Sequence, residues 1–342
     1  MATSNSLTLS STTFAKLTPH PFLLANLQPS DSSIPSARTN GRQPRQARPY
    51  SVNTSSLSHA HGSAVVRSGD TTVICGIRGE TLLTTQIPNY RVPQPSDTAS
   101  LDELRDYDLL VPNVELATGC APNFLPGVPP TTLAQTLSTR LYSLLHSSKL
   151  LNAEDLRIYH DKKQERDAGD MDEDEGETET DELAKEIKAY WVLYIDVLFI
   201  SFDGNPFDVA WAAILAALRD TKLPQAYWDV DREMVLCSRP SLSSVAVPLS
   251  MSGLPVACTA AVFTAKERQK KGDDQFWILV DPDRLEESLC NETVTMVVDR
   301  TEGELKVLTV SKSGGTVVGP AVMREFAKVA GTRWEEFRTV LQ

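Results

Sequence analysis

The chain has 342 residues, of which 41% are hydrophobic and 23% are charged, and these fractions are ordinary for a globular protein. This length can bury a sizeable core, either as one large domain or as two smaller ones. The apolar stretches are shorter than the roughly 18 residues that a membrane-spanning helix needs, so no membrane contact is expected. The formal net charge is −12, but residues 165–182 alone contribute −10. The remaining residues are nearly neutral, which excludes a strongly basic nucleic-acid binder.

Residues 1–50 are predicted to form a flexible N-terminal arm with little regular structure. The segment is rich in serine and threonine, and six prolines would interrupt any long helix. It contains one acidic residue, Asp31, against five basic residues, namely Lys16, Arg38, Arg42, Arg45 and Arg48. This composition also resembles an organellar transit peptide, which stays open as an alternative. A secretory signal is not indicated, because no apolar core follows Met1.

A β-hairpin is predicted at the start of the first half. Residues 62–67 and 71–77 are rich in strand-forming side chains, and the short turn between them contains Gly69, which tolerates a positive φ. Residues 86–130 carry eight prolines and are predicted to be loop. A helix is expected over about residues 131–149, because leucines recur there at helical spacing.

The acidic segment within residues 160–188 is predicted to be a disordered insert. Residues 165–182 hold eleven acids and one base, with few apolar side chains. Folding such a segment would not bury enough apolar surface to offset the loss of conformational entropy. A buried strand over 191–202, a tight turn and a largely apolar helix over about 208–219 follow. This succession indicates a layered α+β core.

The C-terminal part of the chain is predicted to repeat the order of strands followed by a helix. Residues 220–240 are expected to be a linker, and a final helix is expected from about Pro320. Five strands are predicted between them, over residues 245–249, 256–263, 276–281, 293–299 and 305–310. The domain organisation predicted from these elements is an arm over 1–50, a first half over 51–225 and a second half over 226–342.

The cysteines and histidines give no indication of a metal centre or a disulfide framework. The five cysteines are an odd, irregularly spaced set without a C-x-x-C pair, which fits a reducing compartment. The histidines are not accompanied by a cluster of cysteines or carboxylates. We therefore expect neither a metal nor a cofactor.

Several segments of the chain resemble the RNase PH family. The hairpin over residues 62–77 resembles the opening segment of that family. Further matching segments lie at 111–116, 152–156, 191–196, 202–205, 215–218 and 279–282. Their order and spacing are most similar to the RNase PH-like ring subunits of the eukaryotic RNA exosome, from about residue 41 onward. The resemblance implies an α+β, RNase PH-like fold of two similar β-α halves with mixed sheets and packed helices.

The resemblance also implies where a catalytic site would lie. Active members of the family use inorganic phosphate to cleave the last phosphodiester of RNA, and they hold the phosphate with an Asp-Gly-Gly-Ser/Thr-Arg turn. The matching residues here are Asp203, Gly204, Asn205, Pro206 and Phe207. The last three replace a glycine, a hydroxyl and an arginine, and Pro206 also lacks a backbone N–H donor. Each of these changes removes anion-binding capacity.

A pair of carboxylates completes the site in active members. The matching residues are Asp281 and Glu287, and the second is one methylene longer than the family's aspartate. With Asp283 and Glu286 these side chains could be taken for a metal cluster, but a solvated turn after a strand is the preferred interpretation. Because losing one preorganised donor costs roughly 10²–10³ in rate, loss of the whole anion site predicts no independent catalysis.

The sequence thus predicts a non-catalytic structural subunit of the exosome ring that supports 3′-to-5′ RNA processing. The partners implied are other RNase PH-like ring subunits, S1/KH cap subunits, associated exoribonucleases and RNA, in the nucleus, the nucleolus and the cytoplasm. Candidate RNA contacts are Arg78, Arg91 and Arg105, which are equally consistent with ordinary surface arginines. An active phosphate-dependent 3′-to-5′ exoribonuclease using Mg²⁺ stays open as an alternative. So does an organellar RNA-processing protein directed by the arm.

Overall fold

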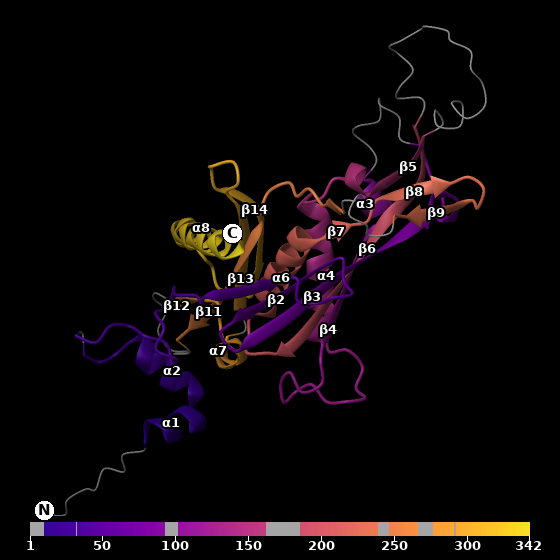
Figure 1. The fold of residues 1–342 in the computed structure, drawn as a ribbon. Helices are drawn as coiled ribbons and strands as arrows, with labels where there is room; N and C mark the ends of the chain where they lie inside the picture. Colours follow the sequence, from indigo (N-terminus) through magenta and orange to yellow (C-terminus); the bar gives the residue numbers. More distant parts are fainter. Residues whose placement is uncertain are drawn as a thin grey trace, which may run out of the picture.

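The computed structural model describes seven ranges of the chain: residues 10–31, 33–92, 102–161, 185–238, 246–265, 276–290 and 292–342. Most of the predicted acidic insert therefore lies outside the described residues. The described part consists of two main sheets and two two-stranded sheets, with helices packed between and beside the main sheets (Figure 1). This arrangement is the α+β fold expected from the sequence.

The larger sheet is mixed and belongs to the first half. Its strands are β1 (Tyr50–Thr54), β2 (Gly62–Ser68), β3 (Thr71–Leu83), β4 (Leu110–Leu116), β5 (Arg157–Asp161) and β6 (Lys185–Ser201). They lie in the order β1-β2-β3-β6-β4, with β5 also paired to β6. All pairs are antiparallel except β4 with β6. The predicted hairpin is confirmed as β2 and β3, and the predicted buried strand is confirmed as the longer strand β6.

Two helices cover one face of this sheet. They are α4 (Thr132–Ser147) and α6 (Pro206–Asp220), both close to their predicted positions. Every residue of α6 from Pro206 to Leu218 is buried, because the helix packs on β2 and β3 on one side and on the second sheet on the other. Its many alanines allow this close approach from both directions. The start of α6 is thereby fixed between the two halves of the chain.

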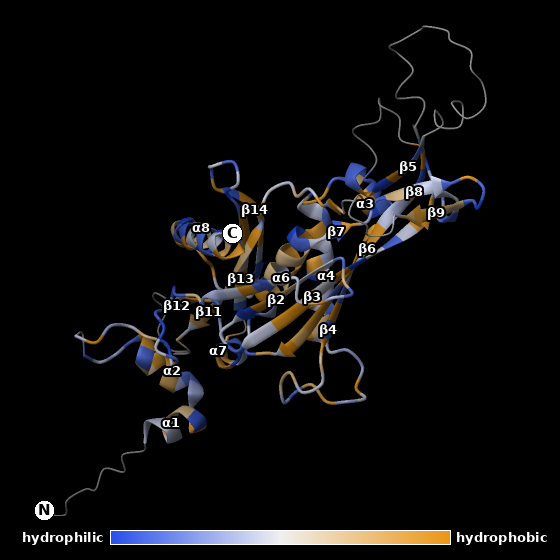
Figure 2. Ribbon diagram, in the orientation of Figure 1, coloured by the Kyte–Doolittle hydropathy of each residue, from blue (hydrophilic) through white to orange (hydrophobic). Residues whose placement is uncertain are grey.

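The second sheet is antiparallel and is followed or covered by α7 and α8. Its strands are β11 (Val256–Thr264), β12 (Phe276–Val280), β13 (Glu292–Asp299) and β14 (Lys306–Ser313), in the order β12-β11-β13-β14. The short helix α7 (Arg284–Leu289) follows β12, and α8 (Pro320–Leu341) packs on β11, β13 and β1. Figure 2 shows hydrophobic residues along the strands around α6 and hydrophilic residues on many of the loops.

The N-terminal segment differs from the arm with little regular structure predicted for residues 1–50. It forms α1 (Ser11–Leu17) and α2 (Pro19–Leu27); α2 lies beside β11 and β12, and α1 packs on α2 (Figure 1). Leu23 and Leu27 of α2 are buried in a small apolar cluster with residues of β11 and β12. Pro19 occupies the first position of α2, where a proline starts a helix instead of breaking it.

Two other segments contain more structure than their composition suggested. The predicted loop over 86–130 includes α3 (Glu103–Asp106) and β4. It begins at the end of the 3₁₀ turn η1 (Thr84–Gln86). Pro112 is tolerated within β4 because that strand is at an edge of the sheet. The predicted linker over 220–240 forms β7 (Lys222–Leu223) and a hairpin of β8 (Ala226–Asp229) and β9 (Met234–Cys237). The remaining short elements are η2 (Ala153–Leu156) and β10 (Val247–Pro248).

The five cysteines are free thiols, and only Cys237 is exposed. No helix within the described ranges is both long and apolar enough to cross a membrane.

Candidate functional site

The turn between β6 and α6 packs directly against the loop between β12 and α7. Gly204 has a φ of +80°, and a Cβ there would lie 2.5–2.6 Å from backbone atoms of Pro282, Asp283 and Arg284. Only glycine allows the two loops to approach this closely. Asn205 is also left-handed, with a φ of +49°, a conformation that asparagine tolerates better than most residues. The two sequence segments of the predicted site therefore meet at one corner, at the start of α6.

Asn205 lies at the centre of this corner and joins its carboxylates. Its backbone N–H donates to Glu287 Oε1 at 2.8 Å, and its Nδ2 donates to Asp281 Oδ1 at 2.8 Å and to Asp208 Oδ2 at 2.9 Å. The structure thus brings together three of the predicted site residues, Asn205, Asp281 and Glu287. It adds Asp208, which sequence analysis had not selected.

Arg48 fills the space next to Asp281. Its Nε and Nη2 donate to the two carboxylate oxygens of Asp281, each at 2.8 Å, and its backbone N–H donates to Oδ2 at 2.8 Å. Its Nη1 donates to the carbonyl and the carboxylate of Asp203, at 2.9 and 3.2 Å. The Arg48 side chain is 8% exposed, and that of Asp281 is 3% exposed. Arg48 from the N-terminal segment therefore binds both oxygens of the first carboxylate of the predicted pair, and Arg42 Nη1 also donates to its Oδ2 at 3.3 Å.

Two further arginines of the same segment bind this loop. Arg42 Nη1 donates to the Asp281 carbonyl at 3.1 Å, and Arg38 Nη1 donates to the Val280 carbonyl at 2.6 Å. Arg38 also forms a bidentate ion pair with Glu286, in which both side chains are fully buried. The solvated turn preferred from the sequence is wrong for Asp281 and Glu286. Their carboxylates are buried because the N-terminal segment supplies the arginines that pair with them.

The other side of the corner holds a buried network around Asp208 and Phe207. Thr259 of β11 donates its N–H and its hydroxyl to Asp208, at 2.7 and 2.6 Å. The guanidinium of Arg140, from α4, stacks over the Phe207 ring with its Cζ 4.0 Å from the ring centroid. Arg140 also donates to the hydroxyl of Thr295 at 2.9 Å. Arg140 therefore brings a cation close to Phe207, the position where the family's phosphate turn has its arginine. The Phe207 ring stacks on this guanidinium and covers one of its faces.

The pKa values of Asp281, Asp208 and Glu287 are shifted in different directions, because these carboxylates differ in their hydrogen-bond and ion-pair partners. Burial alone would raise the pKa of Asp281, but the hydrogen bonds and charge of Arg48, together with Asn205, lower it to about 2. Burial raises the pKa of Asp208, although Thr259 and Asn205 donate to it. Burial also raises the pKa of Glu287 to about 7, against the lowering effect of the Asn205 N–H and of Arg48. Glu287 therefore changes its charge near neutral pH.

Replacing Glu287 with glutamine is expected to change the pH dependence of stability. Because the pKa of Glu287 is raised from 4.5 to about 7 on folding, its contribution is fully present below pH 4.5 and is lost as the pH rises through 7. At pH 8.5 the Glu287→Gln variant should be more stable than the wild type by on the order of 2 kcal/mol, whereas the difference should be several-fold smaller at pH 5. Urea denaturation at both pH values measures this difference. An equal effect at pH 5 and pH 8.5 would contradict the assignment.

Carboxylates surround the start of α6, and most polar groups of the corner have partners, although Asn205 Oδ1 and Arg42 Nη2 are buried without a hydrogen bond. The start of α6 would normally attract an anion, but the Asn205 N–H is already bound by Glu287, and Pro206 has no N–H to offer. Asp208 and Asp281 add two more carboxylates around the same helix end. A free phosphate would have to displace one carboxylate and approach the others against like-charge repulsion.

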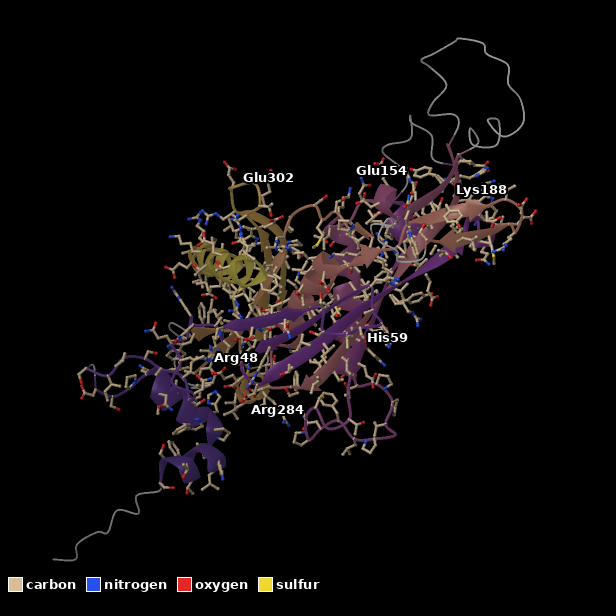
Figure 3. The ribbon with its side chains drawn as sticks, in the orientation of Figure 1. Arg48, His59, Glu154, Lys188, Arg284 and Glu302 are labelled. Carbon is tan, nitrogen blue, oxygen red and sulfur yellow. The ribbon has the colours of Figure 1, made fainter. Side chains whose placement is uncertain are left out.

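The predicted RNA contacts lie away from this corner. Arg78 is exposed on β3 and pairs with Glu80 at 2.9 Å. Arg91 follows η1, Arg105 lies in α3, and both are exposed near Tyr107, whose hydroxyl bonds the Arg91 backbone. Figure 3 shows Arg48 and Arg284 near each other, distant from Glu154 and Lys188 at the opposite end of the first sheet. In the described ranges no group of three or more histidine, cysteine or acidic side chains is arranged to hold a metal ion.

Comparisons with known proteins show the family to which the chain belongs. The sequence profile of the 3′ exoribonuclease family, domain 1, matches residues 46–224, and the profile of domain 2 matches residues 253–332. The chain belongs to the 3′ exoribonuclease family, whose members include RNase PH. The start of α6 lies in the region matched by domain 1, and Asp281 and Glu287 lie in the region matched by domain 2. The corner is thus formed between the two domains of the family.

Individual relatives cover nearly the whole chain. It is 30% identical to exosome complex component rrp43 of Schizosaccharomyces pombe over 321 residues, which is 94% of each chain. It is 27% identical to exosome complex component Rrp42 of Methanothermobacter thermautotrophicus, covering 76% of this chain and 74% of that one. Among solved structures, the chain is similar to a chain of the Archaeoglobus fulgidus exosome with RNA bound to the active site, with a TM-score of 0.63 and 22% identity. The match covers 94% of the present chain and 97% of the archaeal chain.

Sequence analysis missed Arg38, Arg42, Arg48 and Arg140. The first three lie in the segment predicted to be a flexible arm, although five bases against a single acid were visible there. That imbalance was the available signal, because unpaired arginines in a neutral chain indicate acidic partners elsewhere. Arg140 carries no such signal, since it lies within an ordinary amphipathic helix.

Proposed function

We propose that this chain is a non-catalytic structural subunit of an RNA exosome core ring, which supports 3′-to-5′ RNA processing and turnover by forming part of the pore that RNA passes through. Support for the assembly comes from a relative named as an exosome component that aligns over 94% of both chains. Further support comes from the fold shared with a chain of an archaeal exosome.

The observation that carries the non-catalytic part of the proposal is the pairing of Arg48 with Asp281. Both carboxylate oxygens of Asp281 accept hydrogen bonds from the Arg48 guanidinium at 2.8 Å. A Mg²⁺ ion, which the resemblance to active members implies, needs free carboxylate oxygens as ligands. The residues present do not fit that ion. With both Asp281 oxygens bound by Arg48 and the Asn205 N–H bound by Glu287, neither the first carboxylate of the pair nor this backbone donor at the start of α6 is available to a metal ion or a phosphate.

The proposal extends to partners and location. Other RNase PH-like subunits would complete the ring, S1/KH subunits would cap it, and associated exoribonucleases would degrade the RNA that passes through. Arg78, Arg91 and Arg105 are proposed RNA contacts, because they are exposed cations on the first half. We propose that the assembly works in the nucleus, the nucleolus and the cytoplasm, and fluorescent tagging of the full chain tests this. A purely mitochondrial signal would contradict it and favour the organellar alternative.

Two measurements on the purified protein test the function. The full chain, incubated with RNA, inorganic phosphate and Mg²⁺, is expected to release no nucleoside diphosphate above the blank, while an active RNase PH under the same conditions provides the positive control. Affinity purification of the full chain should recover other RNase PH-like subunits in equal amounts. Diphosphate release that disappears in Asp281→Ala would overturn the non-catalytic assignment and favour the active exoribonuclease. Recovery of the chain without such subunits would overturn the ring assignment.

A further inference from the structure

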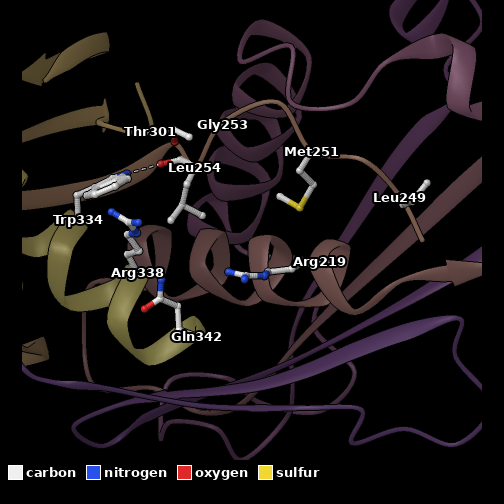
Figure 4. Close-up of a pocket in the computed structure, with 9 residues that line it drawn as sticks. All are labelled: Arg219, Leu249, Met251, Gly253, Leu254, Thr301, Trp334, Arg338 and Gln342. Carbon is white, nitrogen blue, oxygen red and sulfur yellow. Dashed lines mark hydrogen bonds between the residues drawn. The ribbon is translucent and has the colours of Figure 1, made fainter. Parts of the chain in front are cut away.

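A cavity lies far from the corner, at the opposite end of α6. Its volume is about 430 Å³ (Figure 4). The residues that line it come from the ends of α6 and α8 and from the loops before β11 and after β13: Arg219, Leu249, Met251, Gly253, Leu254, Thr301, Trp334, Arg338 and Gln342. Since α6 has 15 residues, the two sites are separated by about 20 Å of helix. This volume is within the roughly 300–1,000 Å³ of typical ligand sites.

Two arginines from different helices converge on this cavity. Arg219 lies in the last turn of α6 and Arg338 in the last turn of α8, and both are exposed. Neither forms an ion pair within the described ranges, although Arg338 Cζ lies 5.4 Å from the centroid of the Trp334 ring, and no acidic side chain is among the lining residues. Cations are favoured at helix C-termini, which explains why each helix has an arginine in its last turn. This preference does not explain why the C-terminal ends of α6 and α8 border the same cavity.

The acidic side chains nearby are already bound elsewhere. Asp220 accepts from the backbone N–H groups of Ser55 and Ser63, each at 3.0 Å. Asp299 accepts from the N–H of Leu254 at 3.2 Å and from Thr301, and Glu335 pairs with Arg300. The positive charge of the cavity is therefore left for a group from outside the chain.

The walls of the cavity favour a peptide over a nucleic acid. Leu249, Met251 and Leu254 are half-buried aliphatic side chains beside the arginines. Trp334 is 2% exposed, and its indole N–H donates to the Leu254 carbonyl at 2.7 Å. Its ring therefore offers no open face on which a base could stack, and single-stranded nucleic acids depend on such faces for affinity.

We propose that this cavity docks an extended peptide segment of a partner protein, with a carboxylate bound by Arg219 and Arg338 and a neighbouring aliphatic side chain packed on Leu249, Met251 and Leu254. Guanidinium groups bind carboxylates with paired, charge-assisted hydrogen bonds, so two arginines on one cavity select an acidic residue. The inference rests on the proposed function for the source of the partner, which is the assembled complex.

Zero-length cross-linking in the assembled complex tests the proposal. In separate Arg219→Lys and Arg338→Lys variants, a water-soluble carbodiimide should couple the introduced lysine amine to the docked carboxylate as an amide. The coupling removes one molecule of water, which the carbodiimide takes up to become a urea. Mass spectrometry should find this amide to an aspartate or glutamate of another chain, next to an aliphatic residue. Arg324→Lys, an exposed position on the same helix, is the matched control and should give no such product. Products confined to this chain's own acids, or none, would overturn the proposal.

A second variant separates a peptide from RNA. The double variant Arg219→Gln with Arg338→Gln should lower the affinity for the cross-linked partner about tenfold for each arginine and leave RNA binding by the complex unchanged. A loss of RNA affinity without loss of the partner would overturn the peptide assignment. Assembly of the wild-type chain is measured first by size-exclusion chromatography. Failure to assemble contradicts the proposed function and this inference together, whereas assembly without the cross-link contradicts this inference alone.

Discussion

Removing either partner of the Arg38–Glu286 ion pair is expected to lower the free energy of unfolding by about 3–5 kcal/mol. Both side chains are 0% exposed, and the pair joins the N-terminal segment to the start of α7. Arg38 also donates to the carbonyls of Val280 and Asp281, so its loss removes a donor from each carbonyl and leaves Glu286 with the Asp283 N–H and Arg42 at 4.0 Å. The cost arises because a buried charge loses its bidentate partner where water cannot replace it.

Urea denaturation of the full chain measures this effect. Arg38→Met and Glu286→Leu should each show the full loss, whereas the double variant should recover much of it, because no uncompensated charge is left. Arg45→Met removes a neighbouring pair with Glu325 whose side chains are 58% and 53% exposed, and it should cost less than about 1 kcal/mol. Single variants as stable as Arg45→Met would show that the pair does not anchor the segment.

The elements that sequence analysis located are those with strong local patterns. The run from Trp191 to Phe199 is apolar and rich in β-branched and aromatic side chains, so strand β6 was evident. The alanine-rich helix α6 was equally clear, because its buried side chains recur all around the helix. Small hairpins such as β8 and β9 were missed, since strands of four residues leave hardly any periodicity. Their pairing depends on the turn and on contact with β5.

The candidate site could be predicted in part. Asp203–Phe207, Asp281 and Glu287 were selected through their resemblance to family motifs, and the structure brings them to one corner. The charges that neutralise the corner could not be predicted in the same way. Arg48 is 233 residues from Asp281, and nothing in a proline-rich segment indicates which acid it will meet. Long-range pairing of charges depends on the folded topology, which composition and periodicity do not specify.

Replacing Arg48 with methionine is expected to cost about 3–5 kcal/mol at pH 7, because the Asp281 carboxylate would remain ionised and 2% exposed without its main partner. The loss should shrink in acid. In the wild type the pKa of Asp281 is lowered from 3.8 to about 2, so the stability that this group contributes is present above pH 4 and is lost as the pH falls towards 2. In the variant, burial with only Arg42 left as an ion-pair partner should raise the pKa of Asp281, and protonation then removes the poorly paired buried charge.

Urea denaturation of the wild type and Arg48→Met between pH 7 and pH 4 follows this convergence, with Arg67→Met as the control for an exposed pair. The curves of the wild type and the control should stay parallel, while that of Arg48→Met approaches the wild type as the pH falls. A constant difference would show that Arg48 acts through packing and not through the charge of Asp281. That outcome would also weaken the case against catalysis, because a carboxylate that does not depend on Arg48 would be free to bind a metal ion.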